Sequence, residues 1–397
     1  MKLCWLIPDD RGGGIVSVAI SCCQQAQKAG HQATLLLALS PTGWIGTNHN
    51  FEIKTLGLTE PALLTPISLW EWLAENPQDV LFLNGCGQAD AAIAYLPSHV
   101  KCVYVVHDTA PRYWQTALAE EANLEAVVAV SQTVSSKFKH LMQQPEKLAV
   151  ILNGSVFPDL PTLSNSRNDD LVFLGGDKPM KGSSDVLQLW RQLTKLEFNG
   201  KLHWFGAISP KFHQKILQLP NSNQICLHGR VTLDKIFSTA ADAKVLLMLS
   251  RVEPFGMATI ESMSMGCVPV AWDIDTGTKE IVSANETGLF APLGNVKILA
   301  NQVMLACDRY VNFQGAVIDQ ARSRFNQTVM WQGYEALINQ VCDLELIERS
   351  KSGQQPMAYQ PPRRRFQLLP PSIRSAIREF VGCSPRLGYW LRDLRGL

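Results

Sequence analysis

Short apolar runs alternate along this chain with segments of helical periodicity. In the first part, residues 15–29 have a helical pattern, and the strand-like runs are KLCWLIP, QATLLLAL, DVLFLNG, CVYVVHD and AVVAVSQ. The alternation returns near Asp170 in DLVFLGG, KLHWFGA, ICLHGRV, VLLMLS and VPVAWD. Strands rich in Val, Leu and Ile that alternate with helices are typical of parallel sheets covered by helices. The pattern therefore predicts an α/β protein with two Rossmann-like domains in tandem.

A stretch rich in Pro, Ser and Asn, SVFPDLPTLSNSRNDD, interrupts the alternation and predicts a linker. We therefore expect an N-terminal domain over residues 1–165 and a C-terminal domain over residues 166–330. Apolar residues have helical spacing over about residues 327–348, and we expect residues 331–350 to form a C-terminal helix that packs back toward the N-terminal domain. Ligands of parallel sheets lie beyond the carboxyl ends of the strands, so a shared ligand is expected in a cleft between the two domains.

The composition of the chain is that of a globular protein. Of 397 residues, 46% are hydrophobic and 18% are charged, as in ordinary globular chains. The ten cysteines show no metal-ligand spacing, which favours reduced thiols and a cytoplasmic location. The first apolar run is followed at once by Asp9, Asp10 and Arg11, so it does not fit a secretory signal or a membrane span.

The charge of the chain is uneven. The formal net charge is +1, yet residues 351–397 hold nine Lys/Arg against two acids, a charge of +7, which leaves −6 for residues 1–350. This near-neutral body gives no reason to expect nucleic acid. Within residues 363–397, Ile373, Ile377 and Phe380 fall on one helical stripe with arginines beside it. Such a basic amphipathic tail fits an anionic membrane surface. Packing of this helix on the protein's own acidic body, or a subunit contact, is an equally open interpretation.

The segment SRVEPFGMATIESMSMG places Glu253 and Glu261 in a run that is otherwise small and apolar. A carboxylate in such a run is costly to bury unless it is paired, and a bound ligand is one candidate partner. Residues 257–265 are predicted to be helical, so a helix N-terminus that attracts phosphate follows Glu253. The N–H groups that crown this terminus belong to Phe255, Gly256 and Met257. Glu261 then lies one turn into the helix, within reach of ribose hydroxyls, although two solvated glutamates remain the alternative.

This segment resembles the paired-glutamate signature of the retaining glycosyltransferases of family 4. The flanking HGRVTLDKIFSTAADAKVLLMLSRVEPFGMATIESMSMGCVPVAWD and GTKEIVSANETGLFAPLGN are similar to the second domain of that family. The resemblance implies a GT-B fold, in which two Rossmann-like domains face each other across a nucleotide-sugar cleft. It also implies sugar transfer from a nucleotide diphosphate donor, with Glu253 at the sugar hydroxyls and Glu261 at the ribose.

Two further motifs lie in the first domain. DDRGGGIVSVA joins the first strand to the first helix, and its glycines allow backbone to approach a ligand closely or simply supply a turn with positive φ. By the resemblance, Gly12, Gly13 and Gly14 lie against the donor diphosphate and the acceptor. His107 follows a strand directly, where ligand-facing residues belong, and the resemblance gives it a contact with the donor sugar. A purely structural histidine is the alternative.

The second domain opens with FLGGDKPMKGSSDV, which resembles the family's phosphate-binding segment. Lys181 occupies the position of the family's lysine, but Gly176 stands where the family has an arginine. Lys178 is a candidate for the second positive charge, or a solvated lysine. By the same resemblance, Arg230 and Val231 of HGRV line the nucleobase pocket.

These observations predict a retaining hexosyltransferase that uses a UDP- or GDP-sugar and gives an α-linkage on a carbohydrate or lipid-linked acceptor. Glu253, His107 and Lys181 are the expected catalytic residues. We expect no metal or other cofactor, since the DID motif at residues 273–275 ends a strand and is interpreted as structural. The alternative is a non-catalytic nucleotide-sugar-binding subunit, motivated by Gly176.

Overall fold

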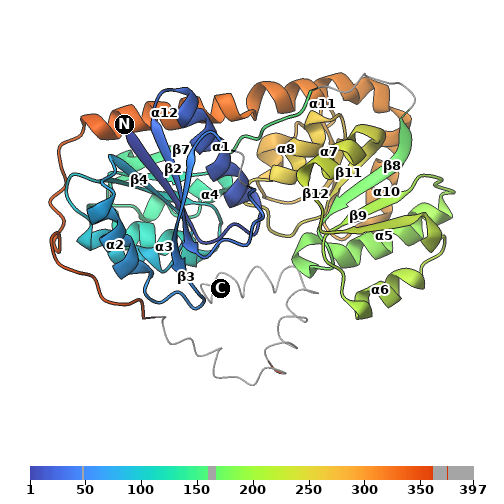
Figure 1. Ribbon diagram of the computed structural model, residues 1–397. Coiled ribbons are helices and arrows are strands. Elements are labelled where there is room, and N and C mark those ends of the chain that lie inside the picture. The colour runs from blue at the N-terminus through green and yellow to red at the C-terminus, as the bar shows by residue number, and fades with distance from the viewer. Residues whose placement is uncertain (47–48, 160–166, 361–372, 374–397) are drawn as a thin grey trace. The chain divides into compact units, whose positions relative to one another are not determined.

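The computed structural model describes residues 1–46, 49–159, 167–360 and 373, and the chain divides into two compact units (Figure 1). The first unit holds the described residues of 1–156 and 327–360, and the second unit holds the described residues of 157–326 together with residue 373. Apart from residues 351–360 and 373, the tail predicted for 351–397 lies outside the described residues.

The division between the units differs from the predicted boundary at 165/166. Phe157 already packs against the hydrophobic core of the second unit. Arg322, near the end of the second unit, donates a hydrogen bond from Nη2 to the carbonyl oxygen of Pro158 at 2.7 Å. The second unit therefore begins nine residues earlier than the Pro and Ser composition indicated, because these side-chain contacts are invisible in the composition.

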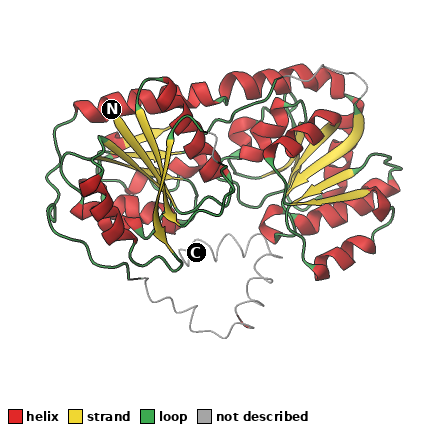
Figure 2. Ribbon diagram, in the orientation of Figure 1, coloured by secondary structure: helices red, strands yellow, loops and turns green. Residues whose placement is uncertain are grey.

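The first unit is built on a parallel sheet, whose described strands follow the order β3-β2-β1-β4-β5-β6-β7. Helices cover both faces of this sheet (Figure 2). The strands are β1 (Lys2–Ile7), β2 (Gln32–Leu39), β3 (Glu52–Leu58), β4 (Val80–Asn84), β5 (Lys101–Val106), β6 (Ala126–Ala129) and β7 (Leu148–Val150). The helices are α1 (Gly14–Lys28), α2 (Thr65–Glu75), α3 (Pro111–Ala119), α4 (Gln132–Ser135) and α12 (Gln327–Asp343).

Burial explains which strands the sequence predicted. Strands β4, β5 and β6 are buried at every position, as expected where helices cover both faces of a parallel sheet. Strand β3 forms the edge of the sheet and is half exposed, with an ion pair between Lys54 and Glu52 on it. Charged side chains on edge strands are common, and they weaken the apolar signal, so this strand was not predicted.

Helix α12 packs on the sheet of the first unit through aromatic side chains. Trp5 of β1 stacks on Phe82 of β4 with ring centroids 4.6 Å apart. Tyr334 of α12 meets Phe82 edge-on at 5.8 Å, and Trp331 lies 6.5 Å from Trp5. This helix begins at Gln327, where the helical spacing of apolar residues begins, four residues before the expected segment 331–350, and it ends at Asp343, short of the predicted ends at 348 and 350.

Residues 344–360, here called the strap, follow α12 without helical structure. The Lys101 Nζ donates to the carbonyl oxygens of Leu344 and Glu345 at 2.8 and 3.0 Å. Arg349 is fully buried and pairs with Glu125 at 2.7 Å. If the helix continued past Asp343, the carbonyl oxygens of Leu344 and Glu345 and the side chain of Arg349 would lie elsewhere. These contacts therefore explain why the helix is shorter than predicted.

The second unit has its own parallel sheet, with described strands in the order β10-β9-β8-β11-β12-β13. The strands are β8 (Asn168–Leu174), β9 (Leu202–Phe205), β10 (Ile225–Gly229), β11 (Ala243–Met248), β12 (Val268–Asp273) and β13 (Leu289–Pro292). The helices are α5 (Ser183–Lys195), α6 (Pro210–Leu217), α7 (Leu233–Asp242), α8 (Met257–Ser264), α9 (Thr278–Ile281), α10 (Val296–Asp308) and α11 (Tyr310–Arg324). Trp190, Trp204 and Trp272 are among its fully buried side chains.

Candidate active site

The loop between β11 and α8 carries the first predicted residues of the site. Gly256 precedes the helix with a φ of 122°, a conformation that side chains rarely adopt. Behind this loop, the Gly277 N–H donates to the Glu253 carbonyl oxygen at 2.7 Å. A Cβ on Gly277 would stand 2.4 Å from the backbone of Phe255, so only glycine permits this approach. The loop is thus fixed by backbone packing, and the first N–H groups of α8 have no acceptor within the helix.

Glu253 and Lys181, which lie 72 positions apart in the sequence, are brought together. The Lys181 Nζ donates to Glu253 Oε2 at 2.8 Å. The lysine side chain is 36% exposed and the glutamate side chain 10%, so the lysine is the more accessible partner of the pair. The Arg251 N–H donates to the Met180 carbonyl oxygen at 2.8 Å, which ties the two segments together beside the ion pair. An anionic ligand that reaches this pair meets a positive charge at its open side.

Glu261 lies in the second turn of α8 and is 7% exposed. Its neighbours Ile260, Ser262 and Met263 are fully buried, so the alternative of a solvated surface glutamate is wrong for this residue. The Ser264 hydroxyl donates to the Glu261 main-chain oxygen at 2.7 Å and closes the last turn of the helix. Glu253 and Glu261 therefore both lie at largely buried positions, before and within α8.

Gly176, where the resemblance places an arginine, has no room for a side chain. Its φ is 55°, and a Cβ there would stand 2.5 Å from the Ala207 carbonyl oxygen. A Cβ on Gly206 would in turn stand 2.6 Å from the Gly176 nitrogen. The loops that follow β8 and β9 therefore approach as bare backbone, and a side chain at position 176 would disrupt that close contact.

The other predicted cations lie on the surface of the second unit. Lys178 and Arg230 are exposed, and Val231 is half-buried. Arg251 was not predicted, and it is buried in an ion pair with Asp185, whose carboxylate also accepts a hydrogen bond from Trp272 Nε1 at 3.0 Å. Its charge is thus compensated internally, and it holds α5, β12 and the loop of Glu253 in one network.

In the first unit, the loop after β1 bears the three glycines. Gly12 and Gly13 have φ values of 84° and 107°, and a Cβ at either would meet open space. Gly14 is the first residue of α1. The positive φ values fit the interpretation of a simple turn. The open space around both residues also fits close approach of a ligand, so the structure agrees with both interpretations.

Asp10 fixes the neighbouring loop and was missed by sequence reasoning. It is 1% exposed, and its carboxylate accepts hydrogen bonds from the N–H groups of Thr42, Gly43 and Trp44 and from the Thr42 hydroxyl. Burial raises the pKa of Asp10, but these four donors outweigh burial and the pKa is lowered below its ordinary value. The only signal in the sequence was its place in the loop that follows the first strand.

His107 follows β5 and contacts the end of the adjacent strand β4. Its Nε2 lies 3.0 Å from Asn84 Oδ1, while the Asn84 amide nitrogen donates to the Phe82 carbonyl oxygen. The Asn84 oxygen therefore accepts, and the neutral imidazole carries its proton on Nε2. Burial lowers the pKa of His107 to about 4, so the ring is uncharged at neutral pH and Nδ1 is an acceptor. Strand β4 separates His107 from the glycine loop along the carboxyl edge of the sheet.

The DID motif ends β12, and its first carboxylate forms an ion pair with Lys279. Among the described residues, no three His, Cys, Asp or Glu side chains are grouped in a way that could hold a metal ion.

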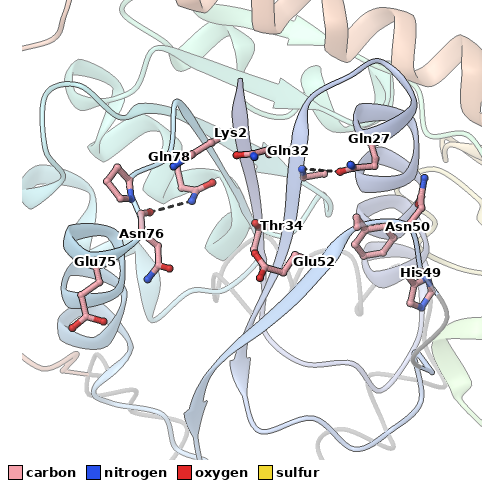
Figure 3. A pocket seen from close by; sticks show the side chains of 13 residues that line it. Lys2, Gln27, Gln32, Thr34, His49, Asn50, Glu52, Glu75, Asn76 and Gln78 are labelled. Carbon is pink, nitrogen blue, oxygen red and sulfur yellow. Dashed lines mark hydrogen bonds between the residues drawn. The ribbon is translucent and has the colours of Figure 1, made fainter.

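A pocket of about 600 Å³ lies at the opposite edge of the first sheet (Figure 3). Lys2, Gln32 and Glu52, the first residues of β1, β2 and β3, line it together with Gln78 and Asn76. It therefore opens at the amino ends of the strands, whereas ligands of parallel sheets bind at the carboxyl ends. The predicted site residues lie elsewhere, and this pocket is separate from them.

Comparison with known proteins identifies the family. A family model described as Glycosyltransferase Family 4 matches residues 12–155, and one described as Glycosyl transferases group 1 matches residues 161–324. The chain therefore belongs to the family-4 type of glycosyltransferases. An uncharacterised glycosyltransferase of Methanocaldococcus jannaschii is 25% identical over 182 residues, which cover 46% of this chain and 49% of the relative. The match thus spans about half the length of that curated relative.

Solved structures show the same fold. HepE of Anabaena in complex with UDP and glucose has a TM-score of 0.71 at 18% identity, covering 86% of this chain and all of that chain. TarM, a protein of S. aureus, reaches 0.74 at 10% identity, covering 85% and 99%. Sucrose-phosphate synthase of Thermosynechococcus elongatus reaches 0.70 at 15% identity, covering 85% and 98%. The predicted GT-B fold of two Rossmann-like domains is confirmed.

Proposed function

We propose that this glycosyltransferase is a retaining hexosyltransferase that moves a hexose from a UDP- or GDP-sugar to a carbohydrate or lipid-linked acceptor and forms an α-linkage. The observation that carries the proposal is the ion pair between Lys181 and Glu253. Glu253 lies four residues before Met257, the first residue of α8. An ammonium, a carboxylate and a helix N-terminus suit a donor that has both hydroxyls and a diphosphate. The HepE structures with UDP and with UDP-glucose add support for a UDP-sugar.

The cationic groups act on the leaving diphosphate. When the bond from the anomeric carbon to the diphosphate oxygen breaks, its electron pair leaves with the diphosphate. Lys181 and the N–H groups of Phe255, Gly256 and Met257 stabilise that charge as it develops. The acceptor hydroxyl attacks from the same face and gives its proton to the departing phosphate oxygen, so the configuration of the anomeric carbon is retained.

The remaining residues bind and orient the donor. Glu253 accepts hydrogen bonds from the sugar hydroxyls, and neutral His107 offers Nδ1 to a hydroxyl of the same sugar. Glu261 accepts hydrogen bonds from the ribose. When the donor binds, Lys181 pairs with the diphosphate instead of the Glu253 carboxylate. That carboxylate can then accept hydrogen bonds from the sugar.

Further contacts of the donor involve both units. Gly12, Gly13 and Gly14 lie against the diphosphate and the acceptor, and the base contacts the segment of Arg230 and Val231. Lys178 supplies a second positive charge in place of the arginine that Gly176 excludes. We propose a reaction without metal or other cofactor, because Lys181 and the N-terminus of α8 already offer positive charge to the leaving group.

The cellular setting completes the proposal. We infer a cytoplasmic enzyme that binds the inner face of an anionic membrane through residues 363–397, whose sequence holds eight arginines against two acids and an apolar helical stripe. In the part of the chain that the structure describes, each helix is too short or too polar to cross a bilayer.

A donor-hydrolysis assay tests the proposed reaction. The full chain is incubated with a panel of UDP- and GDP-hexoses, and slow release of UDP or GDP is expected from one of them, with Lys181→Ala as the matched inactive control. The alternative function, a non-catalytic nucleotide-sugar-binding subunit, is motivated by the backbone contact that excludes an arginine at Gly176. Calorimetric binding of a donor that is never hydrolysed would favour that alternative.

A further inference from the structure

Two hollows adjoin each other at the amino edge of the first sheet. The pocket of about 600 Å³ continues into a second one of about 300 Å³, and Lys2, Gln32, Pro77 and Gln78 line both of them. The second hollow extends past the amino end of β4 to His99. Both volumes lie in the usual range of small-molecule sites, about 300–1,000 Å³. We refer to the two hollows together as the amino-edge groove, and its elongated form suits a chain-like ligand.

Carboxamide side chains are the commonest groups in the larger hollow. They come from α1, from β2, from the segment before β3 and from the segment after α2 (Figure 3). A carboxamide has an oxygen that accepts hydrogen bonds and a nitrogen that donates two, so the set complements a ligand whose groups both donate and accept. Hydroxyl groups do both. The carboxamides belong to Gln27, Gln32, Asn50, Asn76 and Gln78.

Gln78 holds a buried acceptor at the place where the two hollows meet. The residue is 6% exposed, and its Nε2 donates to the Asn76 carbonyl oxygen at 3.0 Å. Its Oε1 is buried and has no hydrogen-bond partner among the residues that the structure describes. Buried acceptors in folded proteins nearly always have a donor. Because Gln78 lines both hollows, a donor that occupies the groove is the natural partner of this oxygen.

His49 supplies a second acceptor of the same kind. Its Nε2 lies 2.8 Å from the Ile45 carbonyl oxygen, which can only accept, so Nε2 carries the proton and Nδ1 of the uncharged ring is an acceptor. Nδ1 is buried and has no partner within the described part of the chain. The ring lies 4.9 Å from that of Phe51, which also lines the larger hollow. Aromatic rings beside hydrogen-bonding groups suit a sugar, whose C–H face is apolar and whose edge bears hydroxyls.

The charges around the groove disfavour an anionic ligand. Among the described residues that line it, Lys2 is the only lysine or arginine, and it stands against Glu52, Glu75 and Asp79. Glu52 pairs with Lys54 at 2.8 Å, and the Asp79 carboxylate accepts the main-chain N–H of Lys2 at 2.7 Å. A phosphate or a nucleotide would meet no surplus of positive side chains here. The orphaned acceptors likewise call for hydrogen-bond donors rather than for an anion.

We propose that the amino-edge groove binds a neutral saccharide of several sugar units. This inference rests on the proposed function, in which the acceptor is a carbohydrate, and it gives that acceptor a second contact far from the reacting sugar. The six residues of β1 span on the order of 20 Å between the two edges of the sheet. The half-exposed edge strand β3 runs from Glu52 in the groove toward the carboxyl edge, and it offers exposed surface along that path. A long acceptor is therefore held at both edges, and a short one at the carboxyl edge alone.

Saturation-transfer NMR with the full-length chain tests the groove. The probes are maltohexaose, cellohexaose and glucose, each titrated to give an affinity, and inorganic phosphate as a competitor. One groove variant is Gln32→Ala with Asn50→Ala, which removes two exposed carboxamides, and the other is Gln78→Met, which removes the orphaned acceptor at similar volume. The matched control is Gln214→Ala with Gln218→Ala, which removes two exposed carboxamides from the second unit. Circular dichroism confirms that each variant folds.

We expect one of the hexasaccharides to bind the wild-type chain and the control alike, and more tightly than glucose. Loss of two hydrogen-bonding carboxamides should weaken this binding on the order of tenfold, and Gln78→Met should weaken it as well. If no hexasaccharide binds, the groove is a hydrated surface and the inference is overturned. It is overturned too if both groove variants bind like wild type, which places the saccharide elsewhere and leaves the carbohydrate acceptor of the proposed function standing. Displacement of the saccharide by phosphate would contradict a site for neutral ligands. UDP or GDP release from the donor panel decides the transferase function separately.

Discussion

Replacing Arg349 with methionine should destabilise the first unit strongly. The guanidinium donates from Nη2 to Glu125 at 2.7 Å, from Nε to the Asn123 carbonyl oxygen at 3.0 Å and from Nη1 to the Pro97 carbonyl oxygen at 3.1 Å. Both side chains of the ion pair are 0% exposed. Methionine fills similar volume but leaves the Glu125 carboxylate buried without its cation, a change that costs about 3–5 kcal/mol.

The loss should depend on pH. Burial raises the pKa of Glu125, and Arg349 opposes that rise, so removal of the arginine raises this pKa further. The folded variant then binds a proton more readily than the unfolded chain does, and its stability falls as pH rises toward the folded pKa. The difference from wild type should therefore be larger at pH 8 than at pH 5.

Urea unfolding followed by circular dichroism at both pH values measures this effect. The matched control is Glu52→Gln, which breaks the ion pair with Lys54, where the two side chains are 57% and 44% exposed, and it should cost at most about 1 kcal/mol. The double variant Glu125→Gln with Arg349→Met should recover part of the loss, because no charge is left uncompensated. An Arg349→Met chain within about 1 kcal/mol of wild type at pH 8 would refute the reasoning.

Three other substitutions test the second unit. Glu261→Ala should weaken donor binding by roughly 10- to 150-fold, since a hydrogen bond to a charged group contributes about 1.5–3 kcal/mol, and unchanged affinity in calorimetry would remove the ribose assignment. Lys181→Ala should lower turnover by on the order of 100-fold with less effect on the Michaelis constant; a raised Michaelis constant with intact turnover would contradict the leaving-group role. Gly176→Ala should destabilise the unit by roughly 1–3 kcal/mol, because its Cβ would stand 2.5 Å from the Ala207 oxygen, and a neutral result in thermal unfolding would show that the loops can separate.

The sequence predicted the elements whose apolar pattern is strong. The run QATLLLAL matches β2 and VPVAWD matches β12 without an error in their bounds, because these strands are buried along nearly their whole length. The half-exposed edge strand β3 and the four-residue edge strand β13 were missed, since neither has a long apolar run. Local pattern therefore identified the centre of each sheet but not every edge.

Contacts between distant positions limited the prediction of the site. Glu253 and Lys181 were identified one at a time by their motifs, but their 2.8 Å ion pair depends on the way β8 and β11 pair. Asp10, Asn84 and Arg251 were missed, because each acts through a partner from another element. Gly176 was noticed as a departure from the arginine that the resemblance places there, yet the close approach of the Ala207 backbone is visible only in three dimensions.

The most direct test of the central claim follows donor hydrolysis by proton NMR. A UDP- or GDP-hexose with an α-linked sugar is incubated with the full-length chain, and the anomeric signals of the released hexose are recorded before mutarotation equalises them. The account predicts that UDP or GDP appears together with the α anomer first, and that Lys181→Ala slows both signals equally. A β anomer that appears first would contradict retention, and a donor that binds yet releases no nucleotide would contradict transferase activity.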